Sequence, residues 1–274
     1  MRLQQVYMFA ILINGAVGFA ADPKSPTMAG SNPGENKELV QGMKFHWCPP
    51  GKFTMGKKGS KSSDAAVEVT LTKGFWIGET EITQAQWSKV MESSPWKGKG
   101  EVKEAEEHAA SYVDYDDAIA FCEKLTKAER AANRLPGDWK YTIPTEAQWE
   151  YACRAGTKTM FSYGDDPDEL LDFGWYRQSI EGEEWAHSVG KKKPNKWGLA
   201  DMHGNVREWC SDWFGEKLPG GKDPTGSKSG LVRIARGGSW HSFSISCQSS
   251  FREFATPDTK DSETGFRVVA VPVK

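Results

Sequence analysis

Three stretches of the chain place apolar residues at the spacing of an α-helix. Two of them begin with a capping box, in which a threonine is followed three residues later by a glutamine: Thr83 with Gln86, and Thr145 with Gln148. The apolar positions that follow predict helices over 83–91 and 145–156. Asp114 precedes the third stretch, where apolar residues recur at intervals of three and four: Ala118, Phe121, Cys122 and Leu125. We therefore expect a longer helix capped by Asp114.

The strand pattern is weaker, and it predicts short strands between long loops. Short apolar or alternating runs bounded by turn residues lie at 52–55, 67–71, 75–77, 232–235 and 266–271. The chain has 12 Trp, 28 Gly and 14 Pro, which suits a loop-rich globule better than a helical bundle. We predict an α+β fold, low in regular secondary structure, whose loops are held by tryptophans, ions or disulfides.

The first twenty residues are typical of an export signal. Arg2 gives a positive start, residues 6–19 are almost all apolar, and the small Gly18 and Ala20 stand where a signal peptidase cleaves. The run is too short and too weakly flanked to span a bilayer well, with an uncleaved anchor as the alternative. We predict a signal peptide over 1–20, a flexible linker over 21–41 and one domain over 42–272. The mature protein would be exported, periplasmic or extracellular, without a membrane span.

The charge balance bears on nucleic-acid binding, and the cysteine count bears on disulfides and metal sites. Lys plus Arg number 35 and Asp plus Glu number 37, so no basic field for a nucleic acid is expected. Five cysteines in a compartment that permits disulfides leave at least one free, metal-bound or paired between chains. Their spacing gives no zinc pattern and leaves the connectivity open. For each, the favoured interpretation is a buried apolar side chain or half of a structural disulfide.

Two segments gather chemistry-bearing residues. The run at 201–208 supplies carboxylates and turned backbone carbonyls, which are calcium ligands; the alternative is an Asx turn that leads into a capped helical turn. The second segment is Arg-Gly-Gly-Ser-Trp at 236–240, followed by Arg252 and Arg267. The adjacent glycines allow close approach of the backbone, and the favoured interpretation of each arginine is a buried structural one. Hydrolase, phosphate-loop and dinucleotide motifs are absent from the sequence.

These motifs, in this order, resemble the formylglycine-generating enzyme family, also called sulfatase-modifying factors. The resemblance rests on segments 42–43, 50–56, 79–83, 201–209, 236–240 and 265–269, and on Pro-Thr-Glu-Ala-Gln-Trp-Glu-Tyr-Ala-Cys-Arg at 144–154. It covers nearly the whole chain beyond the predicted linker. It implies a formylglycine-generating-enzyme fold of the C-type-lectin-like kind.

The resemblance also implies a catalytic pair of cysteines, and this chain has only one of the two. In the oxidases of the family, the double-glycine motif precedes two cysteines, five residues apart, that bind copper(I) and direct oxygen at a substrate cysteine. Ser242 and Cys247 occupy those places here, so Cys247 is the one candidate catalytic residue. A serine hydroxyl does not replace a thiolate on copper(I), and His241 is a weak substitute partner for Cys247.

The calcium ligands of the family, unlike its copper ligands, all have counterparts in this chain. The resemblance implies one calcium ion held at Asp201, Gly204, Val206 and Glu208. A second calcium site of the family requires an asparagine that residues 176–180 lack, so we do not predict that ion.

Two functions follow. The first is an exported oxidase of the family, which converts a sulfatase cysteine or serine to formylglycine with copper and acts on a sulfatase or another exported protein. The second is a non-catalytic, calcium-stiffened binding module for a peptide, protein or glycan, whose ligand surface includes Trp240, His241, Ser242 and Phe251.

Overall fold

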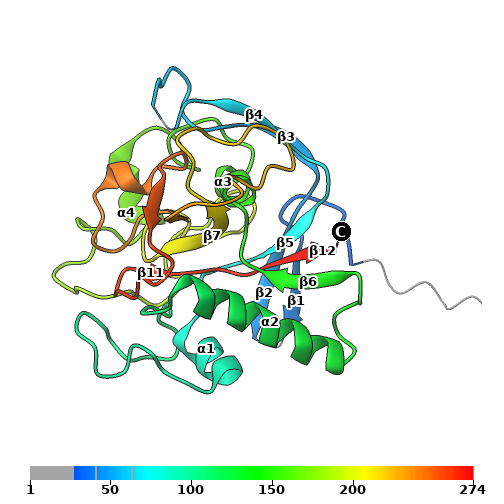
Figure 1. Ribbon diagram of the computed structural model, residues 1–274. Coiled ribbons are helices and arrows are strands. Elements are labelled where there is room, and N and C mark those ends of the chain that lie inside the picture. Colours follow the sequence, from blue (N-terminus) through cyan, green and yellow to red (C-terminus); the bar gives the residue numbers. More distant parts are fainter. Residues whose placement is uncertain (1–27, 41, 63, 274) are drawn as a thin grey trace, which may run out of the picture.

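The computed structural model describes residues 28–40, 42–62 and 64–273 (Figure 1). Its three longest helices are α1 (Gln84–Met91), α2 (Tyr115–Ala131) and α3 (Glu146–Arg154). Both predicted capping boxes are present, and Asp114 caps α2 by accepting from the backbone N–H of Asp117. The three helix predictions are confirmed, because caps and apolar spacing act within a few residues.

The largest sheet is antiparallel, in the order β1-β2-β5-β12-β6. Its strands are β1 (Asn36–Val40), β2 (Met43–Cys48), β5 (Phe75–Gly78), β12 (Val269–Pro272) and β6 (Trp139–Thr142). Helices α1 and α2 lie together beside this sheet (Figure 1). Trp87 of α1 stacks on Phe121 of α2 at 5.7 Å between ring centroids, and both rings contact Phe266. Aromatic packing therefore joins the two helices to the segment that leads into β12.

The edge strand β6 is covered by α2. The hydroxyl of Thr126 accepts from the backbone N–H of Tyr141 at 2.9 Å, and Arg130 donates to the carbonyl of Trp139 at 2.7 Å. These contacts satisfy backbone groups that an open edge would offer to another chain.

Two smaller sheets and short helices complete the fold. One sheet has the order β10-β9-β7-β11 and the other the order β3-β4-β8. The strands are β3 (Gly51–Met55), β4 (Val67–Leu71), β7 (Arg207–Trp213), β8 (Gly221–Lys222), β9 (Arg233–Arg236), β10 (Glu253–Ala255) and β11 (Thr264–Gly265). The short helices are η1 (Pro167–Glu169), α4 (Leu170–Phe173) and η2 (Ser244–Cys247). Long loops join them, as the α+β prediction required.

Buried tryptophans hold several of these loops. Five of them are among the largest fully buried side chains: Trp76, Trp87, Trp149, Trp209 and Trp240. The indole N–H of Trp209 donates to the carbonyl of Val113 at 3.0 Å, and that of Trp240 donates to the carbonyl of Ser262 at 3.1 Å. Each ring thus fills the core while its polar edge fixes a distant loop.

The expected boundaries need corrections. The predicted linker, 21–41, is wrong for residues 28–40: Met28 is buried and its carbonyl accepts from the indole of Trp76, while β1 pairs with β2. The predicted strand at 266–271 is shorter and starts at Val269. The signal peptide, 1–20, lies outside the described residues. No described helix is long and apolar enough to cross a membrane.

All five cysteines are buried, and each is a free thiol. The interpretation of these residues as small buried side chains is confirmed. Tryptophans and arginines, rather than disulfides, therefore tie down the loops that the structure describes.

Candidate functional site

The double-glycine turn starts where β9 ends. Gly237 and Gly238 have φ values of +100° and +73°, which residues with a side chain rarely adopt. A Cβ atom at Gly237 would lie 3.1 Å from the ring of Trp149, and one at Gly238 would lie 2.8 Å from the sulfur of Cys247. Glycine is therefore required twice, because the turn presses directly against buried side chains.

The loop after the turn is held by its own serines. The backbone N–H of Ser239 donates to the hydroxyl of Ser242 at 3.0 Å, and the N–H of Ser242 donates to the carbonyl of Ser239 at 3.0 Å. The hydroxyl of Ser239 donates to Glu263 at 2.6 Å. Trp240 lies beneath, fully buried. The loop thus has a fixed shape before any ligand arrives.

Ser242 and Cys247 lie in different environments. Ser242 is half-buried and bonded to Ser239. Cys247, in η2, is fully buried against Phe161, Leu170 and Tyr176. Burial raises the pKa of the Cys247 thiol far above its usual range, so the sulfur stays protonated at neutral pH.

The loop presents apolar side chains to solvent that the sequence analysis did not select. Phe243 is 56% exposed and Ile245 is 58% exposed. The guanidinium of Arg177 lies 5.0 Å from the Phe243 ring, and the backbone N–H of Arg177 donates to the carbonyl of Ser242. Exposed His241 stacks on Trp240 and lies 3.6 Å from Glu263. This group, Phe243, Ile245, Arg177 and His241, is called the loop surface below.

The predicted ligand surface needs one correction. Trp240 was expected on it but is a core residue, because its indole pins the carbonyl of Ser262. His241 is exposed, and Ser242 and Phe251 are half-buried. The signal that identifies the exposed pair, alternation between polar and apolar residues over 242–246, is too short to separate from a strand or a core turn.

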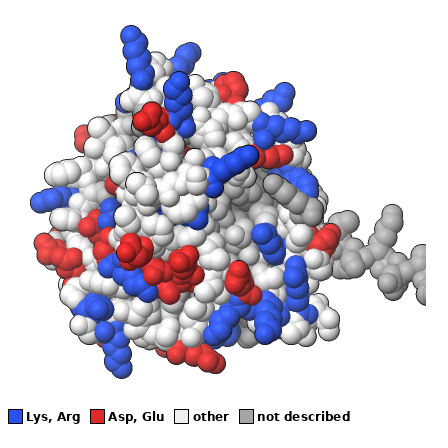
Figure 2. All heavy atoms as spheres, in the orientation of Figure 1, with Lys and Arg blue, Asp and Glu red and all other residues white. Residues whose placement is uncertain are grey.

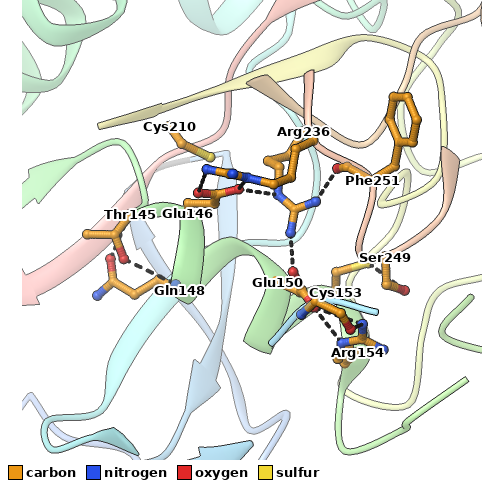
Figure 3. Close-up of polar contacts among 12 residues, drawn as sticks. Thr145, Glu146, Gln148, Glu150, Cys153, Arg154, Cys210, Arg236, Ser249 and Phe251 are labelled. Carbon is orange, nitrogen blue, oxygen red and sulfur yellow. Dashed lines mark hydrogen bonds and ion pairs between the residues drawn. The ribbon is translucent and has the colours of Figure 1, made fainter. Parts of the chain in front are cut away.

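A buried ion network lies behind the loop (Figure 3). Glu146, Glu150 and Arg154 extend from α3, and Arg236 of β9 bonds to Glu150 and to the carbonyl of Phe251. Arg252 forms two bonds to Glu146, at 2.7 and 2.9 Å. Every one of these charged groups is buried. The network fixes both ends of the loop to α3, so the structural interpretation of Arg252 is confirmed.

The run at 201–208 is a set of tight bends followed by β7, so the predicted alternative of a helical turn is wrong. Asp201 and Asn205 adopt φ values of +56° and +64°. Gly204 is required because a Cβ atom there would lie 2.0 Å from the carbonyl oxygen of Trp175. Val206 is fully buried beside Trp240. The bends bury the carboxylate of Asp201 almost completely.

Glu208 is already engaged by an arginine. Its two oxygens accept from Arg267 at 2.6 Å each, and one also accepts from the indole of Trp149 at 2.8 Å. Arg267 further donates to the carbonyls of Gly78 and Ala200. The structural interpretation of Arg267 is therefore confirmed.

Glu81 was not among the residues selected from the sequence. It is buried beside Asp201 and Glu208, and neither of its carboxylate oxygens has a hydrogen-bond partner among the described residues. One oxygen of Asp201 also lacks a partner there, while the other accepts from the backbone N–H of Gly190 at 2.6 Å. Burial, and then the charge of Asp201, raise the pKa of Glu81 well above its usual range, and burial raises that of Asp201 to about 6. The positive charge of Arg267 lowers both pKa values, but it does not offset these effects.

Comparison with known proteins shows the family to which the chain belongs. A model of the sulfatase-modifying factor enzyme 1-like domain matches residues 31–271. The chain belongs to the sulfatase-modifying factor family. The α+β, formylglycine-generating-enzyme fold that the resemblance implied is thereby confirmed.

Similar proteins carry different names. A formylglycine-generating enzyme of Thermomonospora curvata is 30% identical over 226 aligned positions, which cover 73% of this chain and 69% of that protein. A protein of Paenibacillus barcinonensis named chaperone protein LppX is 29% identical over 303 aligned positions, which cover 96% and 98%. Treponema denticola variable protein 1 superposes with a TM-score of 0.75 at 29% identity, covering 84% of this chain and 95% of that one.

The copper site of the family's oxidases does not fit the residues present. Ser242 offers a neutral, hard oxygen that is already bonded to Ser239, and Cys247 is a buried, protonated thiol. Copper(I) prefers soft thiolate ligands, and only one sulfur stands at the two positions. This member of the family therefore lacks the donor set of a two-cysteine centre.

A calcium ion fits better. Glu81, Asp201 and Glu208 carry three negative charges against one positive charge on Arg267 when all are ionised, and a divalent cation supplies the difference. The described residues contain no cluster of three His, Cys, Asp or Glu side chains that could hold a metal by side chains alone. Backbone carbonyls of the 201–206 bends would complete the coordination, as calcium permits. Within the sulfatase-modifying factor fold, such an ion would stiffen the base of the loop rather than react.

Proposed function

We propose that this member of the sulfatase-modifying factor family is a non-catalytic binding module whose loop surface holds an exported polypeptide. One observation carries the proposal: Cys247 packs inward against Phe161 and Tyr176, while the loop above it presents Phe243 and Ile245 outward. The two cysteine positions of the family hold a half-buried serine and a buried thiol, and the exposed residues between them are an aromatic and an aliphatic side chain.

The form of the loop surface supports a protein ligand. Apolar side chains at the centre of a patch, bordered by charged groups, are typical of protein interfaces. Here Arg177 packs on Phe243, and His241 with Glu263 borders the patch. The loop is braced by Ser239, Ser242 and the network of Arg236, so little ordering is required on binding. The name of the similar Paenibacillus barcinonensis protein, a chaperone, agrees with a polypeptide ligand.

We further propose that one calcium ion binds at Glu81, Asp201 and the carbonyls of Gly204 and Val206, with Glu208 orienting the site through Arg267. The unpartnered oxygens of Glu81 and Asp201 support this assignment. The ion would hold the 201–206 bends, and the turn lies directly on them, since the N–H of Gly204 donates to the carbonyl of Gly237 at 2.8 Å.

The binding proposal is tested by a matched pair of surface variants. The double variant Phe243→Ser with Ile245→Ser removes the apolar centre of the loop surface. The control, Leu231→Ser with Phe254→Ser, removes two side chains that are 88% and 55% exposed elsewhere. Each protein carries a photo-cross-linker at His241 and is irradiated in the exporting cell. Mass spectrometry should identify a defined cross-linked polypeptide with the wild type and the control, and none with the loop variant. Equal cross-linking by all three, or by none, would contradict the proposal.

A further inference from the structure

A second concave site lies on another part of the molecule. It is a hollow of about 540 Å³ between the end of β4, strands β6 and β12, the start of α3 and the segment after β8. It shares no residue with the loop surface or with the 201–208 run. On the face drawn in Figure 2, the surface is hollowed near its middle, where Figure 1 places α3, β5 and β12. Small-molecule sites have volumes of roughly 300 to 1,000 Å³, so the hollow has the size of a ligand pocket.

The lining of the hollow is apolar inside and basic at its border. Leu71 and Ile143 are buried in the wall, and Val271 of β12 is half-buried beside them. Lys73 and Lys140 line the hollow and are exposed, and neither forms an ion pair within the described residues. Two positive charges beside an apolar wall favour a ligand with an apolar body and an anionic group.

The lining also contains one acid, Asp223, so the two lysines leave one net positive charge. Asp223 accepts from the backbone N–H of Thr72 at 2.7 Å and from its hydroxyl as well. Its two oxygens are therefore held toward Thr72. The hydroxyls of Thr142 and Thr225, which also line the hollow, form no side-chain hydrogen bond within the described residues and can donate to an anion.

We propose that this hollow binds a small amphipathic anion, with its apolar body on Leu71, Ile143 and Val271 and its carboxylate or sulfonate beside Lys73 and Lys140. The volume matches that of small-molecule sites. The pair of lysines disfavours an amine, and a neutral apolar ligand would leave the lysines without a role. The site is independent of the proposed function of the loop surface.

Titration of the mature protein with anilinonaphthalene sulfonate, a fluorescent aromatic sulfonate, tests the proposal. One equivalent of the dye should bind, and decanoate should displace it. Decanol, which lacks the charge, should displace it at least tenfold less readily, as roughly expected for the loss of two exposed ion pairs. The variant Lys73→Gln with Lys140→Gln should weaken dye binding by about tenfold, whereas Lys52→Gln with Lys89→Gln should leave it within about twofold.

Two further variants locate the dye. Thr142→Trp, which fills the hollow, should abolish binding while the melting transition is retained. Phe243→Ser with Ile245→Ser should leave binding unchanged, which separates this site from the loop surface. Equal affinity in the Lys73/Lys140 variant and the wild type, equal displacement by decanol, or loss of binding in the loop variant would each overturn the proposal.

Discussion

The sulfur of Cys247 lies against the α-carbon of Gly238, so close that a Cβ atom there would stand 2.8 Å from it. The double-glycine turn therefore closes over the one thiol that the family's copper chemistry would need. The same contact fixes which way the loop faces, because Phe243 and Ile245 lie on the stretch between these two residues.

Gly238→Ala should be strongly destabilising. The new methyl group would clash with a buried sulfur and with the carbonyl of Ser246 at 3.1 Å, and the φ of +73° is unfavourable for alanine. We expect a loss of about 2 to 4 kcal/mol in the free energy of unfolding, measured with urea. Gly100→Ala is the control, because no atom lies within 4 Å of its Cβ position. Equal stability of the two variants would show that the turn does not press on Cys247.

Removal of calcium should lower the melting temperature. Chelation with excess EGTA removes a ligand that binds only the folded state, which at about 100-fold saturation is worth about 2.7 kcal/mol, or roughly 5 to 10 °C. Glu81→Gln should abolish this shift, because it removes the charge of a carboxylate with no other partner. Glu79→Gln, a half-exposed neighbour that pairs with Lys44, should keep it. An identical melt with and without EGTA in the wild type would refute the site.

Breaking the ion network behind the loop should cost far more than breaking a surface pair. Arg236→Met removes the arginine that bonds one carboxylate oxygen of Glu150 and leaves only Arg154 paired with this buried acid. Breaking a buried ion pair in this way typically costs about 3 to 5 kcal/mol. Lys193→Met removes an exposed pair with Asp172 and should cost less than about 1 kcal/mol. The comparison is made by chemical denaturation under identical conditions, and similar losses would mean that the network contributes little.

Asp212 should make the fold less stable as pH rises. It is fully buried, and burial raises its pKa from the ordinary 3.8 to about 7. The folded state therefore keeps a proton that the unfolded chain releases above about pH 4, so this contribution to stability falls between about pH 4 and pH 7. Asp212→Asn should gain about 2 kcal/mol relative to the wild type between pH 5 and pH 8. The control variant, Asp138→Asn at an exposed position, should show the same dependence of the free energy of unfolding on pH as the wild type. If Asp212→Asn also shows that same dependence, the raised pKa of Asp212 is contradicted.

The parts of the fold that could be predicted are the local ones. The caps at Thr83, Asp114 and Thr145 act on backbone groups three residues away, so the three helices followed directly from the sequence. Strand β7 was not among the predicted strands, because its pairing with β9 and β11 depends on residues far along the chain. Similarly, β1 is polar and exposed over most of its length, and only its pairing with β2 makes it a strand.

The candidate site was predicted in part. The sequence alone predicted an incomplete copper site, because Ser242 cannot supply a sulfur. The burial of Trp240 and the exposure of Phe243 and Ile245 were not, because they depend on where Ser262 and Arg177 lie. The sequence contained one indication of a buried acid at Glu81, since this residue precedes the apolar Ile82 within segment 79–83. Its position near Asp201 arises only when β5 and the 201–208 run fold together.

The most direct test of a binding module without oxidase chemistry is copper-dependent oxygen uptake. Reduced protein, loaded with copper(I), is mixed with a peptide containing Cys-x-Pro-x-Arg, and oxygen consumption is recorded with aldehyde formation on the peptide. The structure predicts weak copper binding, no oxygen uptake above that of free copper, and no aldehyde. Tight binding of one copper ion with formation of the aldehyde would contradict the account, because Ser242 and buried Cys247 would then support the chemistry of two exposed thiolates.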